Sequence, residues 1–330
     1  METSSQTELD TTPISGTMIG TMPKAFHKPT AYILLMLVTA IWGSTFLITK
    51  HALHLTSPFT FLSLRFAVAT IFLMLAFHRR LRRLTRAELM KGSLIGLFLF
   101  ATIALQALGL QTIASSKAGF LVGLYVPIVP LIAVLFLRQK PTLEAIIGVA
   151  LSFAGLIALS LNSRFDLHIG QGEWLMLGAA LAAALHILGV GKFASEPEID
   201  AVNLTIVQIG VTALLSFGMV FVVGEPKVLP VPMVWLPVIM MGLFATAFTF
   251  VVMNRVQEVV GSTRATLIYA LEPVWAGLFG GLAGETLGLA AWVGCSLILV
   301  GMIVGGLKFR SGKAIPRDYC PGVIPEYCPE

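Results

Sequence analysis

Residues 267–281 read LIYALEPVWAGLFGG, an apolar stretch with an acid and a proline side by side near its middle. Proline removes a backbone hydrogen-bond donor and bends a helix, and an ionisable group within an apolar helix is costly. Glu272 and Pro273 therefore need an explanation from the rest of the chain.

The composition indicates that the chain is folded in lipid. Of its 330 residues, 56% are hydrophobic and only 12% are charged, and the mean hydropathy is +0.88. Because an ordinary soluble domain has about a quarter charged residues, this chain lacks the polar surface that water requires. About 20 apolar residues span the bilayer as a helix. We count ten such runs, at about 31–49, 58–77, 92–110, 118–137, 142–161, 172–191, 202–223, 233–253, 265–283 and 287–307. The predicted fold is an all-α membrane protein with ten transmembrane helices.

The basic residues orient these spans. If the N-terminus is cytoplasmic, seventeen Lys and Arg side chains lie in cytoplasmic tails and loops, four lie in the opposite loops, and Arg65 lies within a span. This asymmetry obeys the positive-inside rule, so the polar tails 1–30 and 308–330 are both expected in the cytoplasm. The basic run HRRLRRLTR at 78–86 is a topology anchor, with anionic membrane lipid as a minor contact, and gives no reason to expect nucleic-acid binding.

The fourth and fifth predicted spans repeat as the ninth and tenth at a fixed offset of 146 residues, and the first and sixth spans match more loosely. The pairs that are hardest to attribute to chance are Pro127 with Pro273, Gly148 with Gly294, and Gly155 with Gly301. The offset divides the chain into two five-helix halves, 31–161 and 172–307. Because five is odd, the second half enters the membrane from the opposite side. Inverted repeats of this kind are typical of secondary transporters, whose ligand site lies near mid-bilayer between the halves.

Two motifs add a family resemblance to this pattern. AIWGSTF at 40–46 and LEPVWAGLFGGLAGE at 271–285, within ten spans arranged as five plus five, resemble the drug/metabolite transporter superfamily in its EamA-type branch. The resemblance covers about residues 31–307. It implies a basket-like bundle with a central cavity and more peripheral fifth and tenth helices. It also implies a multi-pass protein of the bacterial inner membrane that exports amino acids, other metabolites or drugs.

Glu272 is the only carboxylate deep within a predicted span, and its counterpart in the first half is Val126. An ionisable group at a helix centre costs about 2.5–3.5 kcal/mol or more and is by default a functional hypothesis. Three roles are open. Glu272 binds protons in alternation with substrate, neutralises a positive partner, or only forms hydrogen bonds with backbone groups that Pro273 leaves free.

Arg65, in the second span, is the candidate positive partner. At 1.5 Å per residue its depth differs from that of Glu272 by about 6 Å, which an arginine side chain can reach across. Alternatively, Arg65 reaches the outer interface, or it binds a substrate carboxylate, which its planar fork suits. Its counterpart in the second half is Gln208, which is also polar.

Other residues within the spans are candidates for the cavity wall or for bends. His186 either satisfies a buried hydrogen bond or relays protons. The remaining candidates, each with helix packing as the alternative role, are Gln106, Gln208, Trp42, Tyr125, Tyr269 and Trp275. Pro127, Pro130 and Pro273 predict bends in the fourth and ninth helices and are candidate hinges.

The predicted function is secondary active transport. We expect an exporter of small metabolites or amino acids that works by alternating access, with proton coupling through Glu272. The alternatives are an exporter of drugs or cationic toxicants and, in another class, a non-transporting scaffold or receptor.

Enzymatic activity is not expected from this sequence. It has no zinc-binding HExxH, no Ser–His or paired-Asp constellation and no nucleotide-binding motif, so we expect neither a metal site nor a cofactor. GxxxG pairs such as Gly277/Gly281 permit close helix approach within the bundle or between protomers, so a monomer and a homodimer are both open.

Overall fold

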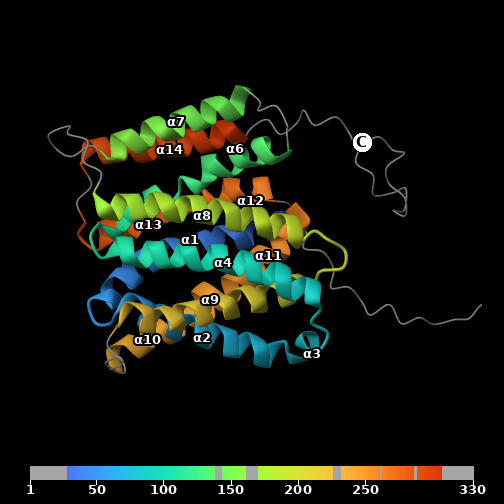
Figure 1. The fold of residues 1–330 in the computed structure, drawn as a ribbon. Helices are drawn as coiled ribbons and strands as arrows, with labels where there is room; N and C mark the ends of the chain where they lie inside the picture. Colours follow the sequence, from blue (N-terminus) through green and yellow to red (C-terminus); the bar gives the residue numbers. More distant parts are fainter. Residues whose placement is uncertain are drawn as a thin grey trace, which may run out of the picture.

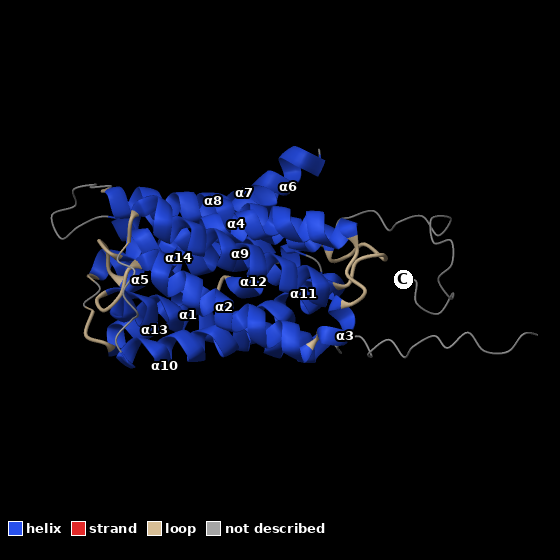
Figure 2. Ribbon diagram, turned by 60° about the horizontal axis from the view of Figure 1, so that its bottom comes forward, coloured by secondary structure: helices blue, strands red, loops and turns tan. Residues whose placement is uncertain are grey.

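The computed structural model describes residues 28–137, 143–160, 170–225, 232–260, 262–285 and 288–306. Every regular element in these ranges is a helix, and the helices run between two ends at which the loops lie (Figures 1 and 2). The predicted tails lie outside the described residues except for 28–30, so their placement stays a prediction.

Fifteen helical elements build the described part of the bundle. They are α1 (Lys28–Leu53), α2 (Pro58–Ala76), α3 (His78–Leu81), α4 (Arg86–Leu110), α5 (Ser115–Val122), α6 (Tyr125–Leu137), α7 (Leu143–Ser160), α8 (Gln171–Phe193), α9 (Ala201–Val223), α10 (Pro232–Met240), the π-helix η1 (Met241–Phe248), α11 (Thr249–Val260), α12 (Ser262–Tyr269), α13 (Glu272–Leu282) and α14 (Leu289–Gly306).

Seven segments of the described residues are long and apolar enough to cross a membrane. They are Thr30–Leu53, Pro58–Ala76, Arg86–Leu110, Ser115–Ile132, Gln171–Phe193, Ala201–Val223 and Pro232–Gln257, and two shorter apolar helices cover Ile146–Gly155 and Trp292–Gly301. The all-helical prediction is confirmed for the described residues. The count of ten spans and the inverted repeat stay predictions.

The fourth and ninth predicted spans are each made of two helices. α5 and α6 form the fourth, and α12 and α13 form the ninth. Pro127 and Pro273 lie in the first turns of α6 and α13. The N–H groups of a first turn have no acceptor within the helix, so a proline there costs no helical hydrogen bond, whereas Pro130 lies further inside α6. Each break thus lies shortly before a proline that predicted a bend.

Small residues bring helices into close contact around these breaks. A Cβ on Gly43 of α1 would collide with Trp275 of α13, and one on Gly119 of α5 would collide with Ala276. Since no larger residue fits at either glycine, α1 and α5 both hold α13 at short range. At one edge of the bundle, α7 and α14 lie side by side (Figure 1), and a Cβ on Gly301 would lie only 2.6 Å from the carbonyl oxygen of Gly148.

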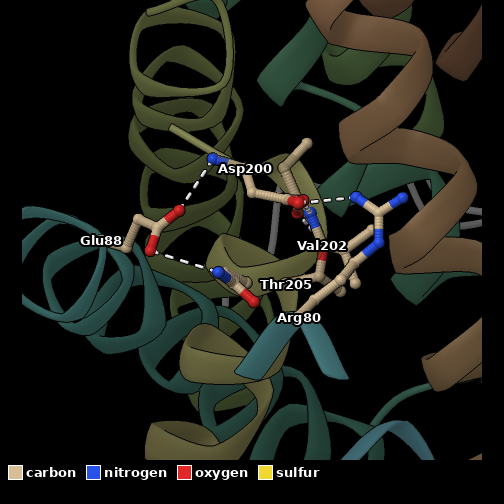
Figure 3. Close-up of polar contacts among 7 residues, drawn as sticks. Arg80, Glu88, Asp200, Val202 and Thr205 are labelled. Carbon is tan, nitrogen blue, oxygen red and sulfur yellow. Dashed lines mark hydrogen bonds and ion pairs between the residues drawn. The ribbon is translucent and has the colours of Figure 1, made fainter. Parts of the chain in front are cut away.

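At the end of the bundle that carries the basic run, Glu88 ties α4 to α9 (Figure 3). Its carboxylate is 2% exposed and accepts hydrogen bonds from the backbone N–H of Asp200 (2.8 Å) and the side-chain amide of Asn203 (3.2 Å). Asp200 in turn accepts a hydrogen bond from the N–H of Val202 (2.8 Å), which caps α9, and forms an ion pair with Arg80 (2.6 Å). The start of α9 is therefore fixed to the base of α4.

At the opposite end, Glu225 ties α9 to α2. Gly224 ends α9 with a φ of 72°, a conformation that glycine adopts without strain. The Glu225 carboxylate that follows accepts hydrogen bonds from the backbone N–H groups of Phe59 (3.0 Å) and Thr60 (2.8 Å), at the start of α2. α9 is thus held at both ends by carboxylates that cap or bridge helix N-termini.

A third carboxylate, in the turn between α13 and α14, caps α5. Gly284 has a φ of 87°, and Glu285 then accepts hydrogen bonds from the N–H groups of Ser115 and Ser116 (both 2.9 Å) and from the Ser115 hydroxyl (2.7 Å). Partial burial acts to raise the pKa of Glu285, but the hydrogen bonds from Ser116 and Ser115 outweigh it and lower that pKa to about 2. Glu285 is therefore ionised at physiological pH and fixes the end of α13 to α5.

Candidate functional site

A cavity lies at the centre of the bundle, between α1, α2, α4, α8, α11 and the break that precedes α13. Apolar side chains such as Leu62, Leu99 and Phe250 make up much of its wall. Six of the nine binding residues predicted from the sequence line it, namely Trp42, Arg65, Gln106, Tyr125, His186 and Glu272. On α1, α2 and α4 the lining residues lie in the half nearest the end opposite the basic run.

Glu272 is the first residue of α13, because the break between α12 and α13 falls directly before it. A helix N-terminus favours a negative charge, so the break gives the acid a more favourable place than a continuous helix would. Its carboxylate, 7% exposed, accepts a 2.8 Å hydrogen bond from the hydroxyl of Tyr125, the first residue of α6. That hydroxyl also lies 3.2 Å from the carbonyl oxygen of Tyr269, at the end of α12. Within the described residues, the donor to Glu272 is thus the side chain of Tyr125 and not a backbone group.

Arg65 is 4% exposed, so it does not reach the outer interface. Its Nε donates a 2.9 Å hydrogen bond to the hydroxyl of Thr246 in η1, and its guanidinium lies 5.3 Å from the ring centroid of Phe66. Among the described residues, no side chain or carbonyl accepts a hydrogen bond from its two terminal amino groups, and no ion pair within 4.0 Å joins it to Glu272. Arg65 and Glu272 therefore line one cavity and form no ion pair with each other.

His186 lines the cavity and forms a hydrogen bond on the side away from it. Its Nε2 lies 2.7 Å from Oε1 of Gln208, and its ring meets the ring of Phe250 edge to face at 5.9 Å. Gln208 is fully buried, and it lies behind His186 and not in the cavity wall. The geometry favours the hydrogen-bonding role of His186 over the proton relay.

Trp42 forms an aromatic wall that is fixed by hydrogen bonds. Its indole N–H lies 3.0 Å from the hydroxyl of Thr249 and 3.2 Å from the carbonyl oxygen of Ala245. Its ring lies 5.7 Å from that of Tyr269, which is fully buried and does not line the cavity. Tyr269 therefore supports Trp42 from behind.

Trp275 also lies outside the cavity wall. It packs across Gly43 and stacks on Phe279 with ring centroids 6.2 Å apart. Its contacts are those of helix packing, the alternative role considered from the sequence.

The sequence interpretation missed three threonines that line the cavity, Thr45, Thr49 and Thr102. Thr45 and Thr49 could have been found from the sequence. Together with Trp42 they recur at helical spacing, which places all three on one face of α1. Among the described residues, no group of three or more His, Cys, Asp or Glu side chains is arranged to hold a metal ion.

A bundle of apolar helices around a central cavity with a few polar groups is the architecture of a membrane transporter. The EamA-like transporter family model matches residues 29–161 and again 170–305, so the chain belongs to the EamA-like transporter family. The chain is accordingly an integral, multi-pass membrane protein that transports a small molecule and is not an enzyme.

Individual relatives agree with this assignment. An uncharacterized transporter of Archaeoglobus fulgidus is 30% identical over 277 residues, which is 83% of this chain and 85% of the relative. An S-adenosylmethionine/S-adenosylhomocysteine transporter of Chlamydia muridarum is 26% identical over 311 residues, 89% of this chain and 97% of the relative. A solved crystal structure superimposes with a TM-score of 0.64 at 21% identity, covering 85% of this chain and 98% of the other, which shows that the two share a fold.

Proposed function

We propose that the chain is a secondary active transporter that exports amino acids or similar small zwitterionic metabolites by alternating access. The main support for the proposal is that Arg65 and Glu272 line the same cavity and form no ion pair with each other. A buried charge without a partner is costly. A ligand with one carboxylate and one ammonium group supplies a partner for both.

The rest of the cavity suits the remaining part of such a ligand. Its aromatic and aliphatic walls, with Trp42 and Phe250 among them, bury an apolar side chain, while threonine hydroxyls offer a few polar contacts. The chlamydial relative is named for S-adenosylmethionine and S-adenosylhomocysteine, and both molecules carry an α-amino acid group. A simple cation would leave Arg65 unpaired and close to a like charge, so cation export is the less supported alternative.

Proton coupling follows from the same carboxylate. An ammonium group and a proton compete for Glu272, so protonation releases the substrate, and an inward proton gradient drives outward transport. The Tyr125 hydroxyl holds the carboxylate in the cavity wall. The orientation we propose has both termini in the cytoplasm of a bacterial cell and the protein in its inner membrane, with the charge asymmetry of the loops as support.

The test begins with a growth-protection screen against toxic amino acids, amino acid analogues and cationic drugs, followed by transport in proteoliposomes under an imposed pH gradient. Labelled L-phenylalanine competes there with two matched analogues. Phenethylamine lacks the carboxylate and 3-phenylpropionate lacks the ammonium group. We expect unlabelled phenylalanine to compete at least about tenfold better than either analogue, since each lost charge pair costs more than about 1.4 kcal/mol.

The variant Glu272→Gln tests the coupling. We expect it to lose transport driven by the pH gradient, and undiminished coupling would contradict the role of Glu272. Equal or better competition by phenethylamine would instead favour a cation exporter. Transport of none of the screened compounds by a folded protein would favour a scaffold or receptor.

A further inference from the structure

We infer that the π-helix η1 positions the charged and aromatic walls of the cavity, and that Thr246 is the positioning residue for the substrate's anionic group. The inference rests on the proposed function and adds to it the reason why Arg65 presents its terminal amino groups to the cavity. η1 lies between α10 and α11 inside the candidate span Pro232–Gln257. π-Helical turns are rare and occur frequently at functional sites.

The first step is the close approach of η1 to α2. A Cβ on Gly242 would lie 2.9 Å from the carbonyl oxygen of Arg65 and 2.9 Å from Cγ1 of Val68. Glycine at this position therefore lets the two backbones touch beside Arg65. Thr246 follows four residues later in η1, fully buried, with its hydroxyl 2.9 Å from the Nε of Arg65.

The second step concerns which atoms of Arg65 this contact leaves free. Guanidinium is a rigid planar fork with five N–H donors. Once Nε is held by Thr246, the plane of the fork is fixed and the two terminal amino groups are the donors that remain. They have no partner among the described residues, and Arg65 lines the cavity. Two parallel N–H donors of this kind suit the two oxygens of a carboxylate.

The third step is that η1, together with Thr249 at the start of α11, also fixes Trp42. The indole N–H lies within hydrogen-bond distance of the Ala245 carbonyl and the Thr249 hydroxyl, and this hydroxyl itself donates to the Ala245 carbonyl at 2.7 Å. Acceptors at Ala245, Thr246 and Thr249 thus hold side chains from both α1 and α2. One short stretch of helix sets the relative position of the cation and the aromatic wall.

The test compares Thr246→Val, which keeps the shape of the side chain and removes the hydroxyl, with Thr246→Ser, which keeps the hydroxyl. The readout is the preference for L-phenylalanine over phenethylamine as competitors of transport, because this ratio measures recognition of the carboxylate. We expect Thr246→Val to lower that preference about tenfold, the effect of one hydrogen bond to a charged group, and Thr246→Ser to restore it. A general loss of stability would not change the ratio.

The matched control is Thr212→Val. Thr212 of α9 is fully buried, donates its hydroxyl to the Gln208 carbonyl at 2.9 Å, and does not line the cavity. We expect this variant to keep the wild-type preference even if its thermal stability falls. Gly242→Ala offers a second route to the same result, because its Cβ would press η1 away from Arg65.

The outcomes separate this inference from the proposed function. If Thr246→Val and Gly242→Ala both transport with the wild-type preference, the positioning role is wrong and the proposed function stands. If Thr246→Ser fails to restore the preference, the hydroxyl is not the group that acts. A wild-type protein that shows no preference for the carboxylate overturns the proposed function, and this inference with it.

Discussion

Replacement of Glu88 by glutamine removes one of the carboxylates that fix α9 at its ends. One Glu88 oxygen accepts from the backbone N–H of Thr85 and from Asn203, and the other accepts from the backbone N–H of Asp200 (2.8 Å). A glutamine that keeps the first two contacts turns its NH2 group toward the Asp200 N–H, so one buried donor loses its acceptor. A hydrogen bond to a charged group is worth about 1.5–3 kcal/mol, and the loss of negative charge at two helix N-termini adds about 0.3–1 kcal/mol.

The expected loss is therefore about 2–4 kcal/mol, which corresponds to a fall of about 3–6 °C in the unfolding midpoint of a 330-residue protein. The measurement is thermal unfolding in detergent at a fixed heating rate, followed by tryptophan fluorescence. The control is Glu198→Gln, since Glu198 is exposed and lies near the same end of the bundle. A Glu88→Gln midpoint that coincides with that of the control would refute the claim that Glu88 holds α4 and α9 together.

Two further predictions concern the opposite end of the bundle and the crossing of α1 with α13. Because the pKa of Glu285 is about 2 in the folded protein and about 4.3 in a free glutamate, its stabilising effect is present above about pH 4.3 and is lost as the pH falls toward 2. Between pH 5 and pH 2.5 the unfolding midpoint of Glu285→Gln should therefore fall less than that of the wild type, and equal falls would contradict the capping role. Gly43→Val should overpack the contact with Trp275 and cost more than about 1–3 kcal/mol, measured as a lower midpoint and reduced transport in proteoliposomes. Gly218→Val is its control and should leave both unchanged, because a Cβ added at Gly218 would meet no side chain or neighbouring helix within 4 Å.

Composition and the spacing of apolar runs were enough to predict a helical membrane protein, because lipid requires each spanning segment to satisfy its own backbone. Pro127 and Pro273 also predicted where two spans deviate from straight helices. The sequence could not show that these deviations are complete breaks, with Glu272 as the first residue of a new helix. A bend and a break use the same residues, and the sequence does not show the close packing of α13 against Gly43 and Gly119 that accompanies the break.

The site was predicted less completely, for a reason that its residues make clear. Hydropathy and helical spacing indicate how deep a residue lies in the membrane, but not which helix is its neighbour. Gln208 and Trp275 lie within predicted spans like the other candidates, yet they pack behind the cavity or beside it. Thr246 carried no signal at all, because a π-helix has the composition of an ordinary apolar helix, and a threonine in it usually bonds its own backbone.

The two charges of the cavity are held across the two matched segments of the chain. Arg65 belongs to residues 29–161 and is held by Thr246 of residues 170–305, whereas Glu272 belongs to the second segment and is held by Tyr125 of the first. Of the Arg, Lys, Asp and Glu residues that the structure describes, only Arg65 and Glu272 line the cavity, so each segment supplies one ionisable group and the hydroxyl that forms a hydrogen bond with the other. A movement of one segment against the other therefore changes the hydrogen bonds of both charges together. In the alternating-access cycle that we propose, this reciprocal arrangement would let the carboxylate and the ammonium group of a zwitterionic substrate be released in one step, without a separate switch for each.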